Sequence, residues 1–237
     1  MKMIAKIGLC LLLVCVCPPG MAQEVLISDS ARIPPFEGCI GYRLTYEGKV
    51  DPAAKPYFPD SMTMFVGRNG LRCRYHGGMS ADLQSEILWD GDTQAIWLLD
   101  QGRKTAQYPS ERWKGFVSKP RRLTEKPVTV AGRPCTAWTL AFEKLVEKVW
   151  VNDSIYFGGR LVDTLSLHQP AFLAAGMRQI PLMTRRTHAD GGVTLLKAVS
   201  ILPGEQDREL FQVPEDYRRI EFDPTEHTHP ILQRKEP

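Results

Sequence analysis

The sequence lacks the short motifs that usually identify an enzyme. No Gly-x-Ser-x-Gly segment surrounds any serine, and the glycines near Gly67 and Gly158 lack the strand–loop–helix context of a phosphate-binding loop. No pair of carboxylates stands out as an acid and a base, since Asp90, Asp92 and Asp100 lie where hairpins are expected to turn. We therefore assign no catalytic residue and predict a non-enzymatic protein.

Groups that would hold a metal or a cofactor are also missing. The chain has 5 histidines, of which only His227 and His229 lie close together, in a polar segment near the C-terminus. Protein metal sites usually need three or four convergent ligands held by a supporting shell. The sequence therefore predicts neither a metal site nor a cofactor.

A strongly basic composition is absent as well. The chain carries 30 Lys and Arg residues against 27 Asp and Glu residues, a formal net charge of +3. Nucleic-acid binding requires a concentrated basic surface that neutralises phosphates. Nucleic acid is therefore not an expected partner.

The N-terminal 22 residues have the pattern of a secretory signal peptide. Lys2 and Lys6 precede an apolar run, residues 7–17, that is shorter than the ~20 residues needed to span a bilayer. Cleavage between Ala22 and Gln23 is expected, and it lowers the charge to about +1. The sequence thus predicts export to the periplasm or cell envelope. Valine before Cys15 and Cys17 disfavours a lipid-anchored form.

Cysteine is too scarce for a disulfide framework. Of the 6 cysteines, only Cys39, Cys73 and Cys135 remain after cleavage, and an odd number allows at most one bridge. A Cys39–Cys73 or a Cys39–Cys135 bridge would join distant strands, and the sequence does not choose between them. Free cysteines buried as small apolar residues are the simpler interpretation.

Alternating apolar and polar residues dominate the rest of the chain. Ile40, Tyr42 and Leu44 share one face of an expected strand, and an Asn-Gly turn at Asn69 predicts a hairpin after it. The pattern predicts a mainly β fold with minor α structure: a curved antiparallel sheet or half-open barrel of about 9–11 strands. Between Leu161 and Met177 the spacing is typical of one or two short helices. We expect a leader at 23–35, one β-rich domain at 36–222 and a polar tail at 223–237.

Short motifs give this pattern a resemblance to a known group. Phe36–Tyr42, Val130–Trp138 and Leu210–Tyr217 resemble the opening strand, the "G-x-x-C" hairpin and the closing "F-x-V-P" segment of small exported proteins in the LolA/LolB-like lipoprotein-carrier superfamily. The resemblance implies an incomplete barrel whose concave face holds acyl chains under a helical cover, here residues 161–177. Met62, Met64, Trp97 and Trp138 are then the candidate lining residues.

Three functions remain open at this stage. The first is binding or carrying an apolar ligand, such as a lipid acyl chain, in the concave face of the sheet. The second is an envelope structural or protein-interaction module, in which the same Met and Trp side chains fill a closed core. The third is a hydrolase with an unrecognised site, which would require a histidine to converge with a serine or an aspartate.

Overall fold

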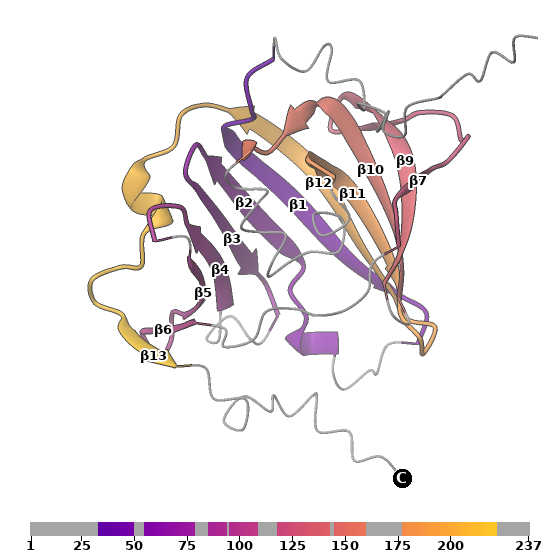
Figure 1. The fold of residues 1–237 in the computed structure, drawn as a ribbon. Helices are drawn as coiled ribbons and strands as arrows, with labels where there is room; N and C mark the ends of the chain where they lie inside the picture. The colour runs from indigo at the N-terminus through magenta and orange to yellow at the C-terminus, as the bar shows by residue number, and fades with distance from the viewer. Residues whose placement is uncertain are drawn as a thin grey trace, which may run out of the picture. The chain divides into compact units, whose positions relative to one another are not determined.

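The described residues form one curved, mostly antiparallel sheet of thirteen strands (Figure 1). The computed structural model describes residues 33–49, 55–78, 85–93, 95–108, 118–142, 145–159 and 177–221. Among them, the mainly β prediction is confirmed, and the sheet is curved and not closed. The strands are β1 (Gly38–Glu47), β2 (Ser61–Gly67), β3 (Gly70–His76), β4 (Ser85–Asp90), β5 (Ala95–Asp100), β6 (Thr105–Tyr108), β7 (Arg121–Arg122), β8 (Val128–Val130), β9 (Arg133–Phe142), β10 (Leu145–Tyr156), β11 (Gln179–Thr187), β12 (Val193–Pro203) and β13 (Arg218–Glu221).

Two antiparallel meanders meet at the centre of this sheet. The strand order is β13-β6-β5-β4-β3-β2-β1-β12-β11-β10-β9-β7, with β8 paired to β9 off this path. β1 joins the meanders by pairing with β12 from Gly38–Pro203 to Glu47–Val193. The expected strand number, 9–11, is too low because β7 has only two residues and β13 is a short edge strand that pairs parallel to β6.

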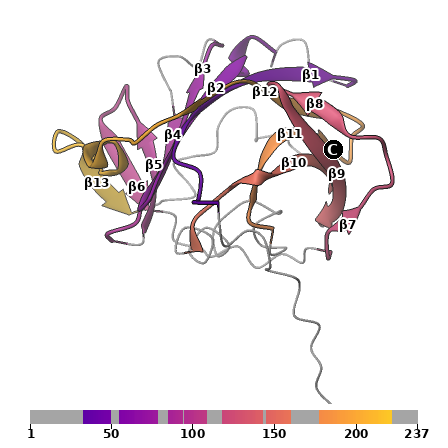
Figure 2. The same cartoon turned by 90° about the horizontal axis from the view of Figure 1, so that it is seen from above.

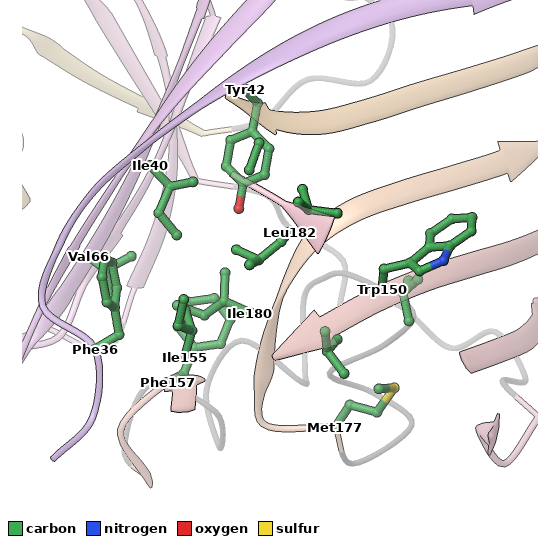
Figure 3. Close-up of a cluster of buried hydrophobic side chains, with 14 of the residues drawn as sticks. Phe36, Ile40, Tyr42, Val66, Trp150, Ile155, Phe157, Met177, Ile180 and Leu182 are labelled. Carbon is green, nitrogen blue, oxygen red and sulfur yellow. The ribbon is translucent and has the colours of Figure 1, made fainter. Parts of the chain in front are cut away.

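The curvature gives the sheet a concave face, which Figure 2 shows from above. Side chains alternate between the two faces of each strand. On β1, Ile40 and Tyr42 point to the concave side, where they pack with Val66 of β2 and Leu182 of β11 (Figure 3). Phe157, which follows β10, packs in the same core. The alternation seen in the sequence therefore separates core-facing from outward-facing residues on these strands.

A second, smaller core lies on the opposite, convex face of β4–β6. The C-terminal segment covers it with the 3₁₀ helix η4 (Arg208–Phe211) and with Val213 and Tyr217, which precede β13. Phe211 fits there because Gly67 and Gly70 have no side chain: an added Cβ would approach its ring to within 2.4 Å and 2.1 Å. The buried members of this second core are Leu88, Leu99, Ala106, Phe211, Val213 and Tyr217.

In the part of the chain that the structure describes, Cys39, Cys73 and Cys135 are free thiols. Cys39 pairs with Phe65 on the convex side of β2, whereas Cys73 pairs with Met64 on the concave side, so the sheet separates the two sulfurs. Cys135 lies on β9, four strands from β1 in the sheet order. Neither of the two bridges that the sequence leaves open is therefore formed.

Several predictions fall outside the described residues. These are the signal peptide with its cleavage site at Ala22 and Gln23, most of the 23–35 leader, residues 161–176 of the expected helical cover, and the 223–237 tail. A helix with the length and apolarity to cross a membrane does not occur within the described ranges.

Candidate functional site: a cavity in the concave face

A cavity of about 250 Å³ lies in the concave face, and we call it the central cavity. Most of its wall is apolar, and the strands on both sides of the β1–β12 junction contribute to it. The lining residues are Tyr42, Leu44, Met62, Met64, Leu71, Cys73, Tyr75, Ile87, Ile96, Glu147, Phe157, Pro181, Thr184, Arg186, Thr194 and Leu196.

One end of the central cavity is apolar. Met64 of β2 pairs with Cys73 of β3, and the next inward pair along the same strands is Met62 with Tyr75. Tyr42 of β1 completes the second row by pairing with Met62. Residues two apart on a strand face the same side of the sheet, and paired residues on neighbouring strands lie side by side. The strand register alone therefore groups these side chains.

The polar groups of this apolar end are neutralised or satisfied. The Tyr42 hydroxyl donates a hydrogen bond to the Pro181 carbonyl oxygen at 3.0 Å. Burial raises the pKa of Tyr42 above its ordinary value, and burial raises the pKa of the Cys73 thiol to about 12. Both groups are therefore uncharged near neutral pH, and this end of the cavity presents no negative charge.

The opposite end of the central cavity is polar. On β12, Leu196 pairs with Thr184 of β11, and the next inward pair is Thr194 with Arg186. Arg186 in turn pairs with Glu147 of β10. The register thus places a threonine, an arginine and a glutamate side by side in one row, beyond the apolar rows.

Glu147 and Arg186 form an ion pair in this row. Arg186 Nη2 donates to Glu147 Oε1 at 2.9 Å. The side chain of Glu147 is 3% exposed, whereas that of Arg186 is 41% exposed. Glu147 Oε2 is buried and has no hydrogen-bond partner among the described residues. The pair therefore has a solvated cation on one side and an unsatisfied anionic oxygen on the other.

The four lining candidates from the sequence divide between two faces. Met62 and Met64 line the central cavity. Trp138 pairs with Val149 on the concave side of β9 and packs against the main core, outside the set of cavity-lining residues. Trp97 pairs with Leu88 and packs on the convex face. The structure therefore brings the two methionines together and separates them from the tryptophans.

The sequence pattern does not indicate the polar end of the central cavity. Glu147 and Arg186 are 39 positions apart, and nothing in the chain marks them as partners before β10 and β11 are placed side by side. Tyr42 and Leu44 share one face of the expected strand, so the alternation is consistent with a cavity position for both. A glutamate at an inward-facing strand position was the available signal for Glu147.

The two described histidines, His76 and His188, each lie against a threonine hydroxyl. His76 Nε2 lies 3.0 Å from the Thr63 hydroxyl, and His188 Nε2 lies 3.0 Å from the Thr194 hydroxyl. Neither ring borders the central cavity. Across the described ranges, no three His, Cys, Asp or Glu side chains come close enough to hold a metal ion.

Comparison with known proteins gives distant structural neighbours only. No protein-family model and no curated protein matches the chain. Among solved structures it is similar to PNGF-II in two crystal forms, at TM-scores of 0.46 and 0.44 and identities of 11% and 12%; 84% of this chain is covered in each. The chain spans about a third of PNGF-II, 34% and 33% in the two forms.

A second neighbour comes from the group that the sequence motifs resemble. It is a LolA superfamily protein from Nitrosomonas europaea, at a TM-score of 0.36 and 12% identity, with 78% of this chain and 93% of that chain covered. Identities this low do not carry chemistry from one protein to another.

Proposed function

We propose that this chain is an exported, non-enzymatic protein that binds an apolar ligand, such as a single acyl chain, in the central cavity. The observation that carries the proposal is the cavity of about 250 Å³ with its mainly apolar wall. In the alternative, a structural module with a filled core, side chains would occupy that space. We propose a periplasmic location because of the signal-like N-terminus and the resemblance to lipoprotein carriers.

The volume limits the size of the ligand. Engineered apolar cavities of about 150 Å³ accept benzene, and sites for drug-sized ligands begin near 300 Å³. A cavity of about 250 Å³ therefore suits one chain or one small ring system. Ligands with several acyl chains would leave most of their apolar surface outside the described walls.

The wall chemistry favours binding over reaction. Met62 and Met64 supply flexible, polarisable side chains, which adapt to ligands of irregular shape. Cys73 has a pKa of about 12 and is therefore a poor nucleophile, because the thiolate is the reactive form. These properties suit retention of an apolar molecule by burial of its surface.

Filling the cavity tests the proposal. In Leu196→Trp, a larger side chain replaces a partly buried lining residue of β12. We expect the affinity for the neutral dye N-phenyl-1-naphthylamine, measured by fluorescence titration, to fall by about tenfold or more. This corresponds to 1.4 kcal/mol or more, the order of the burial free energy of a few methylene groups.

Val199→Trp provides the matched control. Val199 is on the same strand but is 55% exposed, so its replacement leaves the cavity unchanged. Equal dye affinity in wild type, Leu196→Trp and Val199→Trp would refute the proposed site. Absence of dye binding by the wild-type chain would refute the function.

A further inference from the structure

The central cavity is amphiphilic along its length. Its apolar rows run through Met64 and Met62, and its last row holds Thr194, Arg186 and Glu147. Arg186 is 41% exposed and Glu147 is 3% exposed, so this row holds a charged side chain that water reaches beside one that is buried. A ligand with an apolar tail and a polar head therefore has one favourable orientation, with its head beside this row.

Arg186 and Glu147 require different hydrogen-bonding groups on the ligand head. The guanidinium of Arg186 has five N–H donors, and within the described part of the chain only Nη2 is bonded, to Glu147. An ionised carboxylate only accepts hydrogen bonds, so Glu147 Oε2 needs a donor. Leaving a buried charged acceptor unpaired costs more than leaving a neutral one. A complementary head group must both accept from Arg186 and donate to Glu147.

Resting on the proposed function, we propose that the ligand is an uncharged amphiphile whose head carries a hydroxyl or a primary amide. Such a head accepts from Arg186 and donates to Glu147 Oε2. An ionised fatty acid can only accept, so it would place its carboxylate beside the unsatisfied Glu147 oxygen. A quaternary ammonium head can neither donate nor accept a hydrogen bond, and Arg186 repels it.

Three probes with equal chain lengths test this inference. 1-Decanol, decanoate and decyltrimethylammonium are compared at pH 8 by displacement of N-phenyl-1-naphthylamine from the full chain. We expect 1-decanol to bind about tenfold or more tightly than either charged probe, the effect of one hydrogen bond to a charged group. Because the series uses the wild-type protein, it does not depend on the folding of any variant.

Glu147→Gln gives a second, directional test. Glutamine removes the negative charge and supplies an amide donor, so decanoate should bind Glu147→Gln about tenfold more tightly than wild type. Glu125→Gln is the matched control, because Glu125 forms a solvated ion pair with Lys148. It should leave all three affinities unchanged.

The outcomes separate this inference from the proposed function. Equal binding of all three probes, or tightest binding of decanoate to wild type, would overturn the head-group assignment and leave the apolar site standing. An unchanged decanoate affinity in folded Glu147→Gln would also overturn the assignment. Failure of the dye and of every probe to bind would overturn both.

Discussion

Replacing Glu86 should destabilise the protein more than almost any other single change on the convex face. Glu86 is completely buried and accepts hydrogen bonds from Arg72, Arg74 and Gln101. The side chain of Arg72 is itself only 8% exposed. In Glu86→Leu, Arg72 would remain buried without a counter-ion, which costs about 3–5 kcal/mol.

The same change should loosen the C-terminal cover. Arg72 Nη1 donates to the Leu210 carbonyl at 3.1 Å, so the cluster holds η4 against β3. Once Glu86 is gone, the buried Arg72 guanidinium lacks the carboxylate that orients it, so its contact with the Leu210 carbonyl weakens. We expect faster amide hydrogen exchange at Phe211 and Tyr217, which pack in the convex core.

Urea unfolding, monitored by tryptophan fluorescence, measures the loss of stability in Glu86→Leu. Glu125→Leu is the control, because an exposed pair such as Glu125–Lys148 contributes only about 0–1 kcal/mol. The double variant Arg72→Leu/Glu86→Leu should recover much of the stability, since both buried charges are then removed. A loss below about 1 kcal/mol in Glu86→Leu would refute this account of the convex face.

Three further predictions concern packing and ionisation. Gly70→Ala should lower the free energy of unfolding in urea by about 1–3 kcal/mol, because the new Cβ would meet the Phe211 ring. Adding Phe211→Ala should remove that clash, and additive losses in the double variant would contradict this reasoning. Tyr42→Phe should lower the free energy of unfolding by about 1–3 kcal/mol, because the buried Pro181 carbonyl loses the Tyr42 hydroxyl as its donor. An unchanged urea unfolding midpoint would count against this prediction. The Cys73 pKa is raised from 9.0 to about 12, so the unfolded chain loses this proton first and stability should fall between those pH values. Cys73→Ala should flatten this alkaline loss in a pH series of urea titrations, whereas an unaltered slope would show that Cys73 does not contribute.

The β architecture could be predicted because it depends on local signals. Alternation placed Ile40, Tyr42 and Leu44 on one face, and the turn at Asn69 set the hairpin of β2 and β3. β13 escaped prediction because its four residues are held by a parallel contact with β6, a pairing that no turn in the sequence announces.

The site could be predicted only in part, for a related reason. Met62 and Met64 can be predicted because methionine on an inward strand face is visible in the sequence. Trp97 was a candidate on the same basis, but the convex face of β5 is covered by the C-terminal segment and so accepts a large aromatic residue too. The Glu147–Arg186 pair depends on the register of β10 and β11, which pattern alone does not fix.

Native mass spectrometry of the gently purified full chain tests the central claim most directly. If the central cavity binds a single apolar ligand, the wild-type protein should carry one added mass or take up one molecule of 1-decanol. Leu196→Trp should lose that species and Val199→Trp should keep it. A wild-type protein that stays ligand-free after exposure to 1-decanol and to the neutral dye would contradict the claim.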